Sequence, residues 1–239
     1  MSEPAIHNLL YRFAFDDGSI KEFRVEIDGE TLRLLSKPKA PPPAWTRLET
    51  FACSNCPLDK TKHEHCPVAV NLVELIDFFH ASISHQAATL TIETPERTFS
   101  KKTSLQSGVS SLIGIYMTTS GCPIMEKLQP MVRFHLPFAT LEETKYRAIS
   151  MYLTAQYLRQ KAGLDADFSL AGLVKIYEAV RVVNVNFCEK LTTLKVKDAS
   201  LNAISILDSF ADFTTFSIDY EMQDELVKAF HAYLEPAGA

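Results

Sequence analysis

No apolar run in this 239-residue chain approaches the roughly 18 consecutive residues that a membrane-spanning helix requires. Its first residues carry no basic stretch followed by an apolar one, so a secretory signal is not expected. The net charge is −5, and no cluster of Lys and Arg is interleaved with aromatic residues. These absences predict a soluble cytoplasmic protein that binds neither membrane nor nucleic acid, and whose partner is an unidentified protein or small molecule.

The sequence signatures of well-known catalytic sites are also missing. The chain contains no Gly-rich phosphate loop, no His-Glu-x-x-His and no Gly-x-Ser-x-Gly. Residues 16–18 (Asp-Asp-Gly) lack the downstream oxygen ligands of a calcium loop and predict a hairpin turn instead. The sequence therefore names neither a substrate nor a reaction, and it leaves open whether the protein is an enzyme.

Cysteine is scarce along most of the chain but concentrated in one place. Three of the five cysteines and two of the seven histidines lie within the fourteen residues from Cys53 to Cys66. In a reducing cytoplasm, clustered thiols serve metal or redox chemistry more often than structural disulfides. We therefore predict a metal site in this loop.

Cys66 and Cys122 share a local feature, because each is followed by proline at the apparent start of a helix. Proline favours the first helical position, so each thiol is expected at a helix N-terminus. Free backbone N–H groups and the helix dipole favour negative charge there and lower thiol pKa values. We expect Cys53, Cys56, Cys66 and Cys122 to form a four-thiolate metal site.

Two alternatives remain open for the ligands and the metal. Cys53, Cys56 and Cys66 together with His63 also make a complete tetrahedral zinc set. Four thiolates can equally hold an iron–sulfur cluster, which would indicate a redox or electron-transfer protein. We favour structural zinc in a binding or regulatory protein, with the iron–sulfur cluster as the alternative.

A third hypothesis is a thiol-dependent enzyme that uses Cys122, with His135 as its base. Nearness in sequence does not place the histidine beside the thiol, and no third orienting residue is evident. A structural role for His135 is the more frequent case. Cys188 lies beside Phe187 on a helical stripe, so we expect it to be a small buried hydrophobic residue.

The first part of the chain has the alternation of β-strands. Residues 7–34 alternate apolar and polar positions around turn residues, which predicts an antiparallel meander with a third short strand at 31–35. A second hairpin is expected over residues 89–101. Between the hairpins, Pro67 opens a helical pattern.

From Thr140 onward the apolar spacing predicts one helix after another. Thr140 and Glu143 match a capping box, Ser169 is expected to cap the next helix, and further helices are expected from Asp198 and Ser217. The fold class is therefore α+β: a small antiparallel β-containing N-terminal part packs on a C-terminal helical bundle. We place the metal loop in a β-rich part over residues 1–103 and the bundle over residues 104–239, packed as one compact unit.

Three groups of motifs carry a resemblance to a known family. They are Cys-x-x-Cys-Pro-Leu followed by His-Cys-Pro at 53–67, Ser-Gly-Cys-Pro at 120–123, and Arg-Phe-His-Leu-Pro-Phe at 133–138. With these the chain resembles a family of uncharacterised bacterial proteins that is known only as a domain of unknown function. The resemblance covers most of the chain, and it implies no activity and no residue roles.

Overall fold

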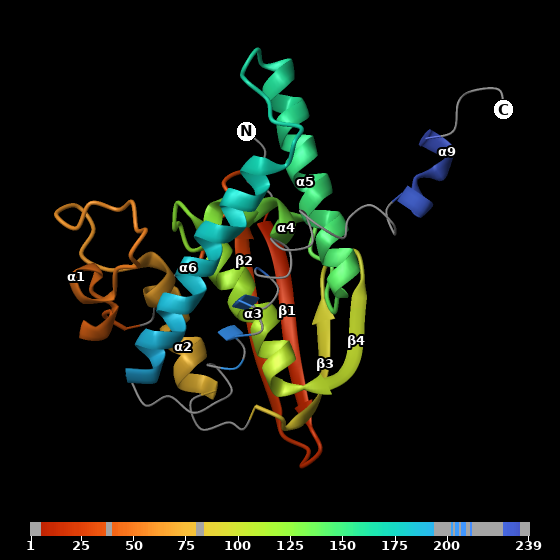
Figure 1. The fold of residues 1–239 in the computed structure, drawn as a ribbon. Helices are drawn as coiled ribbons and strands as arrows, with labels where there is room; N and C mark the ends of the chain where they lie inside the picture. The colour runs from red at the N-terminus through yellow and green to blue at the C-terminus, as the bar shows by residue number, and fades with distance from the viewer. Residues whose placement is uncertain are drawn as a thin grey trace, which may run out of the picture.

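The computed structural model describes residues 6–36, 40–79, 84–193 and 227–234, together with 202, 204, 205, 207, 208 and 211. The fold is α+β, as the sequence predicts: a four-stranded antiparallel sheet is formed by the first part of the chain, and the later part is helical (Figure 1). The predicted helices from Asp198 and Ser217 begin outside the described residues.

The two predicted hairpins join into one sheet. Its strand order is β2-β1-β3-β4, with β1 and β3 in the centre. The strands are β1 (Ile6–Phe15), β2 (Ile20–Asp28), β3 (Ala87–Glu93) and β4 (Thr98–Ser104). β1 pairs antiparallel with both β2 and β3, so the two hairpins, which are far apart in sequence, are joined through β1 and β3.

The third strand that was predicted at 31–35 is wrong. Only an isolated bridge forms there, between Ile27 and Leu34. The Asp28 carboxylate accepts the backbone N–H of Thr31 at 2.7 Å, and Leu32 takes a positive φ of 54°. A carboxylate that satisfies turn N–H groups stabilises a tight turn, so the chain bends where the apolar pattern predicted a strand.

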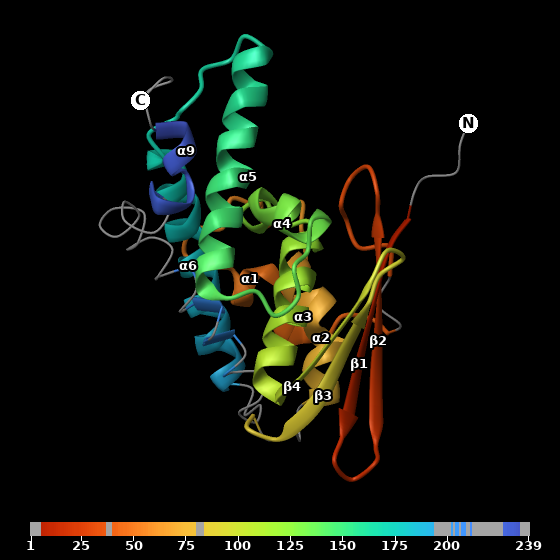
Figure 2. The ribbon, with the colours of Figure 1, turned by 90° about the vertical axis from the view of Figure 1, so that its right-hand side faces the viewer.

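The alternation in β1 separates the two faces of the sheet. Tyr11 and Phe13 are fully buried, whereas Arg12 between them binds Glu22 at 2.6 Å and Glu93 at 3.1 Å on the other face. The helices of the described residues lie on one side of the sheet (Figure 2). The burial of Tyr11 and Phe13 identifies this side as the one that faces the core. The sheet therefore has one face in the core and one polar face, as is common for antiparallel sheets.

The helices form two layers on that face. α2 and α3 lie next to the sheet, and α5 and α6 lie beyond them (Figure 2). The helical elements are η1 (Ala44–Thr46), α1 (Leu48–Phe51), α2 (Pro67–Phe79), α3 (Leu105–Thr119), η2 (Met125–Leu128), α4 (Gln129–Arg133), α5 (Leu141–Lys161), α6 (Ala171–Thr193) and α9 (His231–Leu234). Within the described residues, none of these helices combines the length and the apolar character that crossing a bilayer requires.

The predicted helix starts are confirmed in one case and corrected in another. Thr140 and Glu143 form the complete capping box at the start of α5, with hydrogen bonds of 3.2 and 2.7 Å. At α6 the stronger cap is Asp167, which accepts the backbone N–H of Gly172 at 2.8 Å. Ser169 accepts only a 3.4 Å bond from Ala171. Asp167 is the stronger cap because an ionised carboxylate accepts hydrogen bonds from helix N–H groups more strongly than a hydroxyl does.

Gly108 sets how closely α3 approaches the sheet. A Cβ at this position would lie 2.7 Å from Phe13 Cε1 and 2.9 Å from Leu90 Cδ2. We predict that Gly108→Ala lowers the free energy of unfolding by about 1–3 kcal/mol in urea titrations, because it overpacks the core. Gly114→Ala on the same helix is the matched control, since among the described residues its Cβ would meet only Leu207, at 3.4 Å. Equal stability of the two variants would contradict the prediction.

Candidate metal centre

The cysteine loop is closed by a short backbone pairing just before α2. Cys66 donates its N–H to the carbonyl of Thr46 at 2.8 Å, and Leu48 donates to Glu64 at 2.8 Å. The hydroxyl of Thr46 also contacts His65 Nδ1 at 2.7 Å. These contacts fix Cys66 directly ahead of Pro67, the first residue of α2.

Side chains on both sides of the loop anchor it to α6. Asn55, between the first two cysteines, donates to the carbonyl of Ala179 at 2.9 Å. Phe51 packs edge-on against Phe187, with ring centroids 4.8 Å apart. The loop and α1 lie beside α6 (Figure 1). The loop therefore rests on the helical layer as well as on the start of α2.

Cys122 reaches the loop from the end of α3. Gly121 has φ 94°, a left-handed conformation that suits glycine and turns the chain after the helix. The carbonyl of Cys122 then accepts the N–H of Glu126 at 2.9 Å as the chain enters η2. The turn places Cys122 in the core, 8% exposed.

The four predicted ligand thiols share one neighbourhood. Burial is the main reason that the pKa of Cys53 rises to about 12, and the other three thiols, Cys66, Cys122 and Cys56, each raise it further. The pKa of Cys66 rises to about 11 by burial, with contributions from Cys122 and Cys56. Because a like charge raises a thiol pKa only at short range, the structure brings Cys122 to the loop thiols.

The backbone N–H groups that follow Cys66 and Cys122 lower the thiol pKa values as predicted, but they do not determine the net pKa. The predicted helix start at Pro123 is wrong: Pro123 lies in a turn, and the four-residue 3-10 helix η2 begins only at Met125. The N–H groups of Ala69 and Val68 lower the pKa of Cys66, and those of Met125 and Ile124 lower that of Cys122. Burial outweighs them, so both pKa values are raised, against the expectation from helix position alone. Without a metal these thiols are protonated at neutral pH and are poor nucleophiles.

The four thiols lie near one another, but they are not arranged around a common metal position. Among the residues that the structure describes, no three His, Cys, Asp or Glu side chains stand where they could together hold a metal ion. A bound ion would therefore require the side chains to rotate inward. A cysteine side chain has a single rotatable torsion with three staggered positions, so such a change is local.

The two histidines of the loop point to other partners. His63 is exposed and lies near Asp59, whose pKa it lowers. His65 contacts Thr46 through Nδ1. Within the described residues no hydrogen bond joins either ring to a cysteine of the loop. The structure thus gives His63 no advantage over Cys122 as the fourth ligand.

His135, the weaker catalytic candidate, lies in a different environment from Cys122. Its Nε2 is 2.8 Å from the hydroxyl of Tyr11, which in turn contacts Ser111 at 3.0 Å. No hydrogen bond connects His135 and Cys122 in the described part of the chain. Cys188, expected to be buried, is only half-buried, with Sγ 3.9 Å from Ser205 Oγ. It packs against the core as a partly buried residue, so burial of its helical stripe is incomplete.

Sequence reasoning missed the residues that anchor the loop. Asn55 looked like a spacer within Cys-x-x-Cys, and Lys190, which donates to the carbonyl of Thr50 at 2.8 Å, looked like an ordinary surface lysine. No local pattern distinguishes such residues, because their partners come from distant parts of the chain.

The fold and the cysteine cluster together define an α+β protein with a candidate metal centre between its loop and its helices. The chain belongs to the family DUF6901, a domain of unknown function, whose model matches residues 9–231. This confirms the resemblance to an uncharacterised domain family. No curated protein and no solved structure matches the chain.

Proposed function

We propose that this protein binds one zinc ion through Cys53, Cys56, Cys66 and Cys122, and that the ion has a structural role. The observation that carries the proposal is that Cys122, although far from the loop in sequence, lies close enough to raise the pKa values of Cys53 and Cys66, and that Cys56 raises the pKa values of the other three. Four protein ligands leave no open coordination position, and closed sites of this kind are structural rather than catalytic.

The donor set fits zinc in chemistry and in charge. Thiolates are soft ligands that zinc binds well, and metal binding displaces the protons that burial otherwise retains. Four thiolates around a divalent ion leave surplus negative charge. The N–H groups of Val68 and Ala69 at one helix start, and of Ile124 and Met125 at the other, offset part of it. In this role the cysteines tie the loop, the start of α2 and the end of α3 together.

The proposal predicts about one zinc per chain in protein purified anaerobically under reducing conditions. Cys122→Ser should lose most of this zinc, because three thiolates bind more weakly than four. Cys188→Ser is the matched control and should retain the metal, since its thiol contacts Ser205 rather than the other cysteines. Elemental analysis of the three proteins gives the result directly.

Two further readouts separate the alternatives. If the purified protein contains iron and has broad visible absorbance, the site holds an iron–sulfur cluster and not zinc. Cobalt substitution counts the thiolate ligands through the intensity of the sulfur-to-metal charge-transfer bands. Intense bands that weaken in Cys122→Ser but not in His63→Ala support four sulfurs, and the reverse pattern supports His63. Absence of metal from the wild-type protein, with no binding on titration, overturns the proposal.

A further inference from the structure

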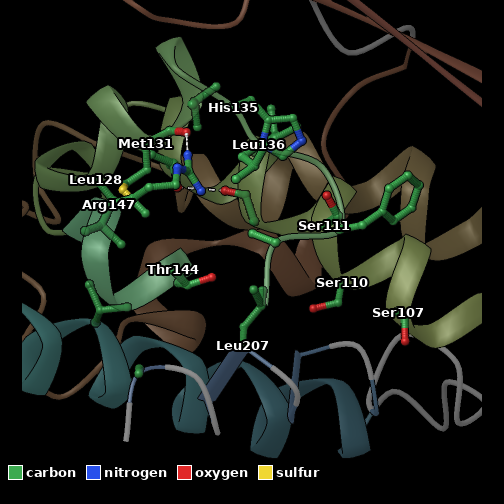
Figure 3. A pocket seen from close by; sticks show the side chains of 18 of the residues that line it. Ser107, Ser110, Ser111, Leu128, Met131, His135, Leu136, Thr144, Arg147 and Leu207 are labelled. Atoms are coloured by element: carbon green, nitrogen blue, oxygen red, sulfur yellow. Dashed lines mark hydrogen bonds between the residues drawn. The ribbon is translucent and has the colours of Figure 1, made fainter. Parts of the chain in front are cut away.

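A cavity of about 400 Å³ lies between α3 and the outer helical layer, apart from the cysteine loop (Figure 3). Cavities of this size accommodate small organic ligands. Arg147 and Thr144 of α5 lie on one side, and Ser110 and Ser111 of α3 lie on the other (Figure 3). Apolar side chains make up most of the wall, among them Ile115, Leu128, Val132 and Phe138.

The charges at this cavity are of one sign. Lys101 and Arg147 line it, and no Asp or Glu of the described residues does. Arg147 is half-buried and uses Nη2 to donate to the carbonyls of Met131 and Phe134, both at 2.8 Å (Figure 3). Among the described residues no carboxylate lies within ion-pair distance of its guanidinium. Partly desolvated cations are normally paired, so Arg147 has capacity left for an anion.

A second polar group at the cavity lacks a partner. Asn184 of α6 is 1% exposed, lines the cavity, and its Oδ1 is buried with no hydrogen-bond partner in the described structure. A buried amide oxygen without a partner costs free energy comparable to a lost hydrogen bond. Its presence on an apolar wall indicates that a bound molecule supplies the missing partner.

The histidine at the cavity does not contribute positive charge. His135 also lines it, but burial and the nearby Arg147 lower its pKa to about 3. The ring is therefore neutral at physiological pH, and its Nε2 can accept from the hydroxyl of Tyr11. Arg147 is thus the half-buried cation of the cavity, and Lys101, whose Nζ lies 5.9 Å from the ring centroid of Phe138, is the exposed one.

We propose that this cavity binds a small amphipathic carboxylate. The carboxylate pairs with Arg147, and the apolar body lies along Ile115, Leu128 and Val132. The free Oδ1 of Asn184 is an acceptor, so its partner is a hydroxyl or amide donor elsewhere on the ligand and not the ionised carboxylate. The planar guanidinium matches a carboxylate in shape and charge, which favours an organic acid over a neutral lipid. The zinc proposal and this one are independent, because none of the four ligand cysteines lines the cavity.

The test compares three probes by isothermal titration calorimetry: octanoate, octan-1-ol and acetate. Octanoate has both features of the proposed ligand, octan-1-ol lacks the charge, and acetate lacks the apolar body. We expect one octanoate per chain, bound at least about tenfold more tightly than either of the others, since a charge-assisted hydrogen bond and apolar burial are each worth tenfold or more.

Variants assign the binding to this cavity. Arg147→Met should lower the affinity for octanoate by about tenfold or more and leave the affinity for octan-1-ol unchanged. Arg147→Lys should still bind the acid more tightly than the alcohol. Ser110→Leu should lower the affinity for both octanoate and octan-1-ol, because the larger side chain fills part of the cavity. Arg159→Met is the matched control: Arg159 is on the same helix, also donates to a backbone carbonyl, and does not line the cavity.

Several results would overturn the proposal. They are equal affinity for octanoate and octan-1-ol, an octanoate affinity that Ser110→Leu leaves unchanged, or no binding at millimolar octanoate. Thermal unfolding of each variant shows whether it is folded. If Arg147→Met does not fold, Arg147→Lys and Ser110→Leu decide the question. Because none of the four ligand cysteines lines the cavity, failure here leaves the metal measurements untouched.

Discussion

Removing the proposed zinc with a chelator is expected to lower the free energy of unfolding by about 4 kcal/mol, relative to protein kept at free zinc a thousandfold above the dissociation constant. The proposed ion would bind the folded chain, in which the four cysteines are neighbours, far better than the unfolded chain, in which they are separated. Urea unfolding with and without chelator, under reducing conditions, measures the difference. Adding zinc back should restore the original value.

The loss should also be localised. Hydrogen exchange should increase first in the loop over residues 52–66 and at the turn over 120–128, and least in the central strand β1, whose backbone is paired on both sides. Cys188→Ser should respond to the chelator as the wild type does, and Cys122→Ser should respond much less. Unfolding curves that are identical with and without chelator would rule out a structural metal.

The strands could be predicted from the sequence where buried and exposed residues alternate strictly. Tyr11 and Phe13 alternate with polar neighbours, and a period of two places them on one face whatever the rest of the chain does. The apolar residues at 31–35 satisfied the same pattern but do not form a strand. There the side chain of Asp28 binds the turn backbone, and this local hydrogen bond decides the conformation.

The cysteine cluster was predictable only in part. Cysteine followed by proline placed Cys66 and Cys122 ahead of helical segments, and both thiols do receive backbone N–H groups there. The net direction of their pKa was not predictable, because it depends on burial. That burial is created by packing of the loop against α6, through contacts such as Phe51 with Phe187.

The cavity could not be predicted from the sequence. Arg147 lies in a helix of mixed polar and apolar residues, and Asn184 follows two valines in another. Arg147 reads as a surface residue, and Asn184 as a polar interruption of a core stripe. Only the packing of α3 against α5 and α6 shows that, among the described residues, Arg147 is a half-buried cation without an ion-paired carboxylate and Asn184 has a buried amide oxygen without a hydrogen-bond partner. Such sites depend on which elements meet, and periodicity contains no information on that.

Protonation of His135 should destabilise the protein in mild acid. Its pKa is about 3 in the folded chain, against 6.5 for an unperturbed histidine, because the ring is buried and lies near Arg147 and His7. Between these two values the unfolded chain binds a proton that the folded chain does not. Stability is therefore complete above about pH 6.5 and falls as the pH decreases toward 3, by up to roughly 1.4 kcal/mol per pH unit.

Replacing His135 by glutamine tests this origin. Gln keeps an acceptor for the hydroxyl of Tyr11 but does not titrate, so the free energy of unfolding of His135→Gln should vary less between pH 6.5 and 4.5 than that of the wild type. Urea titrations at several pH values give the slope. The control is His85→Gln, at an exposed position, which should keep the wild-type slope. If His135→Gln and the wild type lose stability in parallel, acid sensitivity comes from other groups, and the buried ring takes up its proton without unfolding the chain.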